Sequence, residues 1–357
     1  PPQPLPKAAL AAPYTAPYTA SQTAYSSTAA RNQQALINKV HRFWIQGVLE
    51  QSLHGQVLLT LGLEERQQAL ALPWNISWKT DTQPVQPLAA GTSVFDIFQR
   101  LGEGRSLLIL GEPGAGKTTT LLTLARDLLA QRSTRRPIQP TVQPVSQQRI
   151  PAIFNLSSWT GGPIEQWLVS ELNSKYQIPK AIGQAWVKEQ QMLLLLDGLD
   201  EVRRDLQSDC GAALNQFYRD YGPELVVCCR ANDYEALDQK LAFQSAVYVR
   251  SLTDEQIWHY LDQAETGLTG LRSLLKKSRQ NSDLQPVDVQ ANKSGQDLFE
   301  LARSPLILNI MVLTYQGISA SQIPALSSGK SYTHQLFSAY VERMFQRRDM
   351  ASPYSKQ

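Results

Sequence analysis

The stretch SLLILGEPGAGKTTTLLTL, residues 106–124, decides how this chain folds. Residues 107–110 are all apolar, which is typical of a strand buried on both faces of a parallel sheet. Residues 111–118 fit the pattern G-x-x-x-x-G-K-[ST], and the residues after them favour a helix. A strand, a glycine-rich turn and a helix in this order predict a phosphate-binding loop, the P-loop.

Each position of this loop has a physical task. Its glycines allow a tight turn that points backbone N–H groups at phosphate, and the helix that follows adds its positive dipole end. We expect Lys117 to reach the β- and γ-phosphates and to take part in catalysis, and the Thr118 hydroxyl to ligate Mg²⁺. The expected nucleotide-binding residues here are Gly111, Glu112, Pro113, Gly114, Ala115, Gly116, Lys117, Thr118 and Thr119.

A cluster of acids behind a leucine run is the second signal. Asp197 ends an apolar run, so its carboxylate is predicted at the carboxyl edge of the sheet, where it would hold Mg²⁺ directly or through water. Asp200 or Glu201 would orient or deprotonate the attacking water, with a slight preference for Asp200. The alternative for these acids is that they cap the next helix.

Arg230 is a third candidate, because it directly follows the apolar run at 226–229. Its planar, permanently charged guanidinium is suited to a γ-phosphate. The alternative is an ordinary surface arginine after a strand.

Apolar runs and helical patterns alternate through the middle of the chain, which predicts a parallel sheet covered by helices on both faces. The expected strands are residues 106–110, 152–156, 192–196, 224–229 and 245–249. The expected helices between them are residues 117–130, 164–176, 181–189 and 206–221.

The chain is expected to divide into five segments. These are a disordered Pro/Ala/Tyr-rich leader (1–30), a helical lead-in (31–101), a nucleotide-binding domain (102–250), a helical subdomain (251–350) and a tail (351–357). The lead-in is expected to hold helices from residue 31, at 63–72 and at 93–101. The subdomain is expected to hold helices 254–263, 268–278, 297–302, 306–315 and 332–347, with a loop at 280–296. A further exposed loop is expected at 132–150, within the nucleotide-binding domain.

The composition of the chain limits the classes of function that it can have. The net charge of +3 and the 18% of charged residues do not by themselves mark a nucleic-acid binder. No apolar run reaches the roughly 18 residues that span a bilayer, and no signal peptide is visible. The three cysteines, Cys210, Cys228 and Cys229, suit buried positions rather than a disulfide framework. We therefore expect a cytoplasmic protein, and the start without Met indicates a fragment whose membrane anchor, if any, would lie outside it.

Taken together, these motifs resemble the NACHT family of STAND signalling NTPases, from about residue 31 to about residue 347. The likeness rests on residues 111–119, on residues 193–201 with the small Gly198, on Asn155-Leu156-Ser157-Ser158-Trp159, and on Ser304-Pro305-Leu306. The lead-in, with Trp44-Ile45 and Val48-Leu49-Glu50, is similar to that of bacterial, especially cyanobacterial, members. Cys228-Cys229 departs from the family, which more often has hydroxyl residues there.

The resemblance implies an α/β, AAA+-like P-loop NTPase fold of three layers, with a five-stranded parallel sheet ordered 5-1-4-3-2, followed by a helical subdomain. It implies ATP/ADP and Mg²⁺ as cofactors, slow hydrolysis, and a conformational switch that forms a homo-oligomer on activation. Effector and sensor domains would lie outside residues 1–357. It places Pro305 against the nucleotide base; from the residues alone, Pro305 is a helix N1 residue after Ser304.

Two other function classes stay open. An AAA+-like ATPase acting on nucleic acid would need a basic stripe, and only residues 132–149 are dense in arginine. An interaction module would hold its nucleotide without turnover. A small-molecule kinase is the least supported class, because no arginine-bearing lid is evident.

Overall fold

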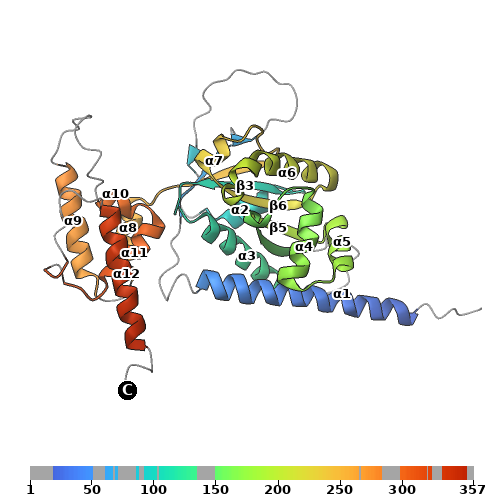
Figure 1. The fold of residues 1–357 in the computed structure, drawn as a ribbon, viewed down its shortest axis with the longest axis horizontal. Helices are drawn as coiled ribbons and strands as arrows, with labels where there is room; N and C mark the ends of the chain where they lie inside the picture. Colours follow the sequence, from blue (N-terminus) through green and yellow to red (C-terminus); the bar gives the residue numbers. More distant parts are fainter. Residues whose placement is uncertain are drawn as a thin grey trace, which may run out of the picture.

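The computed structural model describes residues 19–50, 61–66, 69–70, 86–87, 92–102, 104–134, 149–264, 267–283, 298–319, 321–323 and 332–351. Figure 1 shows helices α1 to α7 gathered around a central sheet and helices α8 to α12 in a separate group. The two groups have separate apolar cores.

The five expected parallel strands are present and form the middle of the sheet. They are β3 (Ser106–Gly111), β4 (Ile150–Asn155), β5 (Met192–Asp197), β6 (Glu224–Arg230) and β7 (Ser245–Val249). Their spatial order is β7-β3-β6-β5-β4, which is the predicted order 5-1-4-3-2 counted among these strands. Almost every residue in them is buried, as their apolar sequences require. The P-loop NTPase fold class is therefore confirmed.

The sheet continues beyond β7 with two short antiparallel strands, β1 (Leu63–Glu65) and β2 (Gln86–Pro87), which raise its total to seven strands. The predicted helix over 63–72 is therefore wrong at its start, and residues 67–68 and 71–72 lie outside the described part. Leu-Glu-Glu suits a helix by propensity, but here it pairs with the open edge of β7 and buries Leu63.

The predicted helices between the strands are present as α3 (Lys117–Thr134), α4 (Ile164–Tyr176), α5 (Lys180–Lys188) and α6 (Gln207–Tyr221). Figure 1 shows α6 on one side of the sheet and α3 on the other. The short helix α7 (Ala231–Glu235) and the 3₁₀ turns η3 (Leu156–Ser158), η4 (Leu199–Glu201) and η5 (Arg204–Leu206) were not expected. Two of these turns, η3 and η4, follow strands at the carboxyl edge of the sheet.

The amino-terminal helix α1 (Thr19–Val40) begins well before Arg31 and continues as the π-helix η1 (His41–Glu50). The disordered leader predicted for 1–30 is therefore wrong for 19–30, where Ala, Ser and Gln permit a helix, and residues 1–18 lie outside the described part. The helix is fastened to the sheet domain by Lys39, whose ammonium donates to the Tyr176 carbonyl at 2.6 Å. The predicted helix at 93–101 is present as α2 (Val94–Arg100).

All helices predicted after the sheet are present. They are α8 (Asp254–Gln263), α9 (Thr269–Asp283), α10 (Leu298–Ala302), α11 (Pro305–Tyr315) and α12 (Tyr332–Ala351). Helices α3 and α9 extend a few residues into the predicted loops, whose centres at 135–148 and 284–297 lie outside the described part. None of the helices in the described ranges is long and apolar enough to cross a membrane.

The three cysteines are free and buried, as expected. Burial raises the pKa of the Cys210 thiol to about 12, so it stays protonated at neutral pH. Cys228 lies under the P-loop helix, where its thiol donates to the Lys117 carbonyl at 3.8 Å.

Candidate nucleotide site

The P-loop is the turn between β3 and α3. At two of its positions the backbone conformation and the close neighbours suit only glycine. Gly114 (φ +73°) and Gly116 (φ +95°) lie in the left-handed region. A Cβ at Gly116 would lie 2.8 Å from a methyl of Leu61, and one at Gly114 would lie 2.9 Å from the Ser304 hydroxyl. The loop is therefore contacted by the chain before β1 and by the start of α11.

The structure brings Lys117, Thr118 and Asp197 together at the carboxyl edge of the sheet. The Lys117 ammonium donates to the carbonyls of Gly111 and Glu112, each at 3.0 Å, so it lies across the mouth of the loop. The Thr118 hydroxyl donates to Asp197 Oδ2 at 2.8 Å. The Lys117 contacts are local to the loop, whereas the Thr118–Asp197 contact follows from the parallel register that aligns the ends of β3, β6 and β5.

The Asp197 carboxyl is buried, with 8% of the residue exposed. Burial raises its pKa above the usual 3.8; the Thr118 hydrogen bond and the Lys117 charge oppose that rise, and Glu201 and Asp200 add to it. A hydroxyl beside a buried carboxylate fits Mg²⁺, which proteins hold through one or two carboxylates plus substrate phosphates. No group of three or more His, Cys, Asp or Glu side chains that could hold a metal occurs in the described ranges.

Asp200 contacts a different residue from the one that Asp197 contacts. Its Oδ1 accepts the backbone N–H of Arg230 at 3.0 Å, and its Oδ2 pairs with Arg230 Nε at 2.8 Å. The Asp200 side chain is only 4% exposed, whereas the Arg230 side chain is 47% exposed. Asp200 therefore fixes Arg230 at the end of β6, and both of its oxygens are used in doing so.

Glu201 is the exposed acid of the cluster. Its side chain folds over Gly198 (φ +74°), where an added Cβ would lie 2.9 Å from the carboxylate. Its Oε2 accepts from Asn155 Nδ2 at 3.0 Å. Gly198 therefore allows both the left-handed turn and the position of this carboxylate.

The amino end of α11 lies on the P-loop. The Leu306 N–H donates to the Gly114 carbonyl at 3.3 Å, and the Ser304 hydroxyl donates to the same carbonyl at 3.4 Å. Pro305 stands between them at the first position of the helix, and Ser304 makes no side-chain cap. A contact of Pro305 with a base stays a prediction.

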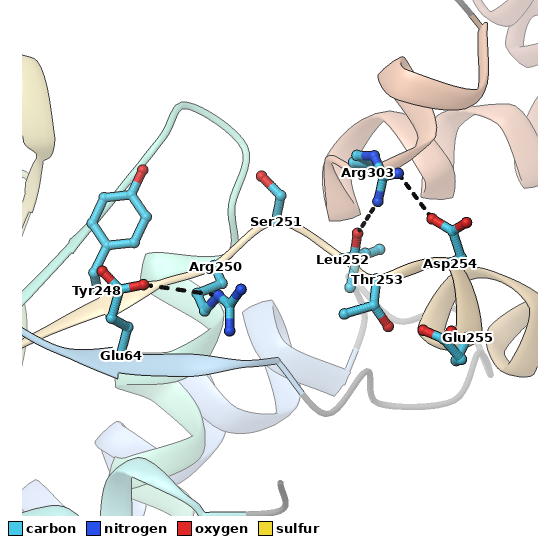
Figure 2. A pocket seen from close by; sticks show the side chains of 9 residues that line it. All are labelled: Glu64, Tyr248, Arg250, Ser251, Leu252, Thr253, Asp254, Glu255 and Arg303. Carbon is cyan, nitrogen blue, oxygen red and sulfur yellow. Dashed lines mark hydrogen bonds and ion pairs between the residues drawn. The ribbon is translucent and has the colours of Figure 1, made fainter. Parts of the chain in front are cut away.

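A second group of contacts joins the P-loop to the end of β7. The Tyr248 hydroxyl donates to Glu112 Oε1 at 2.8 Å. Next to it lies an open depression of about 490 Å³, shown in Figure 2, along the linker from β7 to α8. There Arg303 donates to the Leu252 carbonyl at 3.1 Å and pairs with Asp254 at 2.8 Å. Both arginines that line the depression are thus paired with acids that also line it, Arg303 with Asp254 and Arg250 with Glu64 at 3.8 Å.

Sequence reasoning missed three of these contacts. Leu61 and Tyr248 carry no motif, and their approach to the loop depends on β1 and β7 forming that edge of the sheet. Asn155 lies in the stretch 155–159 that supports the family resemblance, but the sequence does not predict its contact with Glu201.

Removing the Asp197 charge should stabilise the protein in the absence of ligand. Because the folded pKa of Asp197 is raised, the contribution of this carboxyl to stability is fully present below its unfolded pKa of about 4 and is lost as pH rises through the folded pKa. Asp197→Asn keeps an oxygen for Thr118 and removes the buried charge. We expect a higher melting temperature than wild type at pH 7 in EDTA, and no gain at pH 4. A higher melting temperature at pH 7 for Asp238→Asn, an exposed control, would show that the effect is not specific.

A P-loop between parallel strands ordered 5-1-4-3-2, facing Asp197 at the carboxyl edge, defines a nucleotide-binding P-loop NTPase. Within this class, residues 105–266 match the family model of the NACHT domain, which belongs to the STAND P-loop NTPases.

Two solved structures show a distant likeness to part of the chain. PCH-2 of C. elegans is 16% identical with a TM-score of 0.26; the match covers 70% of this chain and 62% of PCH-2. Cdc6p of Pyrobaculum aerophilum is 15% identical with a TM-score of 0.30; the match covers 68% of this chain and 79% of Cdc6p. The chain thus spans less than two thirds of PCH-2. A comparison with curated proteins finds no match.

Proposed function

We propose that this chain is a slow, Mg²⁺-dependent ATPase that uses the exchange of ADP for ATP as a conformational switch. The observation that carries the proposal is the 2.8 Å contact between Thr118 and Asp197, which gathers a hydroxyl and a buried carboxylate beside Lys117. The proposed partners are further copies of this chain and sensor or effector domains, and the proposed location is the cytoplasm.

The bound nucleotide would lie over the P-loop. Backbone N–H groups of the loop and the Lys117 ammonium would hold the phosphates, and Thr118 and Asp197 would hold Mg²⁺. A Mg²⁺ ion held by Thr118 and Asp197 would supply positive charge that offsets the negative charge of the phosphates. Arg230, held by Asp200, would face the γ-phosphate.

Of the two candidate bases, the geometry favours Glu201. Both oxygens of Asp200 accept from Arg230, while Glu201 is exposed and, among the described residues, is hydrogen-bonded through Oε2 only. We propose that Glu201 takes a proton from water as the water oxygen bonds to the γ-phosphorus and the bond to the bridging oxygen breaks toward ADP. This reverses the slight preference for Asp200 drawn from the sequence.

The switch would act through the contact between α11 and the P-loop. Leu306 and Ser304 both donate to the carbonyl of Gly114, so a change in the loop alters the position of α11 and with it the helical subdomain. Pro305 would contact the base. A ligand shifts such an equilibrium only if it binds the two arrangements with different affinity.

Hydrogen exchange of the protein loaded with Mg·ADP and with a non-hydrolysable Mg·ATP analogue tests the switch. We expect exchange at residues 300–310 to differ between the two states, with a larger assembly in the ATP-like state by light scattering. Equal exchange and equal size would overturn the switch and leave a module that only holds nucleotide. ATP turnover with and without DNA or RNA separates our proposal from a nucleic-acid-dependent ATPase, for which turnover would rise.

A further inference from the structure

The amino-terminal helix is an α-helix along α1 and winds as a π-helix over the ten residues of η1. Four of its apolar side chains are buried in the core of the sheet domain: Leu36, Val40, Ile45 and Leu49. These positions lie four, five and four residues apart, which is wider than the 3.6-residue turn of an α-helix. The π winding therefore aligns Ile45 and Leu49 with the buried face of α1.

An α-helical winding of η1 would bury a different pair of side chains. At 3.6 residues per turn, Phe43 and Val48 would join the apolar stripe that starts at Leu36. Ile45 and Leu49 would then lie outside that stripe. In the π winding Phe43 and Val48 are instead exposed, to 54% and 39%. The sequence thus carries two apolar pairs, and each winding buries one of them.

The position of η1 connects its winding to the nucleotide site. It packs against α3, the helix that begins at Lys117, and Trp44 Nε1 donates to the Tyr176 hydroxyl on α4 at 2.9 Å. Figure 1 shows the amino-terminal helix running along the sheet domain beside α3 and α4. Rewinding would exchange the side chains that η1 presents to this domain, so the two windings would contact it differently. Such a difference is what lets a ligand favour one state over another.

We propose that η1 is a switch between a π-helical and an α-helical winding, and that its winding is linked to nucleotide binding at the P-loop. π-Helices are rare and often occur at functional sites, which fits this role. The two windings require no nucleotide, whereas the link to the P-loop rests on the proposed function.

Gly47 gives a way to shift the balance. A Cβ at Gly47 would lie 3.2 Å from the carbonyl oxygen of Arg42, five residues earlier, which is the hydrogen-bond spacing of a π-helix. Gly47→Ala therefore crowds the π winding, and alanine is favoured over glycine in an α-helix. The control is Gly211→Ala on α6, where an added Cβ has no neighbouring atom nearer than 3.7 Å.

Thiol labelling reads out the winding, because the three native cysteines are buried. Phe43→Cys and Ile45→Cys place one thiol on each apolar pair, and mass spectrometry measures its rate of reaction with N-ethylmaleimide. Without nucleotide, the thiol at position 43 should react about tenfold or more faster than the thiol at position 45. Adding Gly47→Ala should slow the reaction at 43 and speed up the reaction at 45, each by about threefold or more. Adding Gly211→Ala should leave both rates unchanged.

The opposite directions of the two changes separate rewinding from local unfolding, which would speed up both reactions. Two rising rates, or two unchanged rates, would overturn the switch. Val48→Cys and Leu49→Cys repeat the test on the other member of each pair, with slowing expected at 48 and acceleration at 49. They cover the case in which Ile45→Cys does not fold.

Calorimetric titration with Mg·ATP tests the link to the P-loop. Because linkage is reciprocal, Gly47→Ala should change the Kd for Mg·ATP by about fivefold or more, and Gly211→Ala should not change it. Opposite labelling changes with an unaltered Kd would overturn the link and leave the proposed ATPase intact. A wild-type protein that binds no Mg·ATP would overturn the proposed function and the link, while the labelling result would still decide whether η1 has two windings.

Discussion

Replacing Lys117 with alanine is expected to weaken ATP binding by about 100-fold or more. The Lys117 ammonium lies over the mouth of the P-loop, on the carbonyls of Gly111 and Glu112, where a nucleotide would place its phosphates. A pair of unit charges about 4 Å apart is worth ~4 kcal/mol at an effective dielectric near 20, before desolvation, and ~1.4 kcal/mol corresponds to a tenfold change in affinity. Calorimetric titration of Mg·ATP into wild type and variant measures the difference.

The matched control is Lys188→Ala, which removes an exposed lysine at the end of α5. It should bind Mg·ATP with wild-type affinity. Equal affinity for Lys117→Ala and wild type would mean that nucleotide does not bind at this loop, and both the proposed site and its mechanism would have to be abandoned.

Replacing Glu201 with glutamine is expected to lower kcat by about 100-fold or more while the Kd for Mg·ATP stays close to wild type. General base catalysis contributes roughly 10²- to 10⁴-fold to a rate, and the amide cannot accept the proton. Glutamine keeps the size of the side chain and an oxygen that accepts from Asn155. Single-turnover hydrolysis with protein in excess over ATP measures this step without product release.

Asp200→Asn is the informative comparison, because the two acids are adjacent in sequence but differ in their contacts. Asp200 is nearly fully buried and paired with Arg230, so its loss should lower the melting temperature by releasing a buried ion-pair partner. If Asp200→Asn stays as stable as wild type and loses hydrolysis while Glu201→Gln retains it, the base is Asp200 and our assignment is wrong.

The centre of the fold could be predicted because its signals are local. Each core strand is a short apolar run that ends at a turn or an acid, and the P-loop pattern fixes where one strand stops and a helix starts. The same logic placed Asp197 at the sheet edge near Thr118, where the structure has it.

The edge of the sheet could not be predicted in this way. The residues of β1 favour a helix by propensity, and they form a strand because β7 offers an unpaired edge, which is a tertiary effect. The helical start at Thr19 could not be predicted for a different reason, because a composition poor in large apolar residues predicts disorder.

The different contacts of Asp200 and Glu201 also depend on tertiary structure. Sequence gives two adjacent acids after Gly198, and nothing local shows which of them faces β6 and which faces β4. The strand order decides it, because β6 brings Arg230 to Asp200 and β4 brings Asn155 to Glu201.

The central claim is that Lys117, Thr118 and Asp197 bind one triphosphate with its magnesium ion. Its most direct test is the Kd of wild-type protein for ATP, measured with excess Mg²⁺ and again with EDTA. We predict that removing the metal weakens ATP binding by about tenfold or more, because the Asp197 carboxylate repels the phosphates unless a cation lies between them. Binding that is equally tight or tighter in EDTA would contradict the claim, since the buried carboxylate would then face the phosphates without a metal.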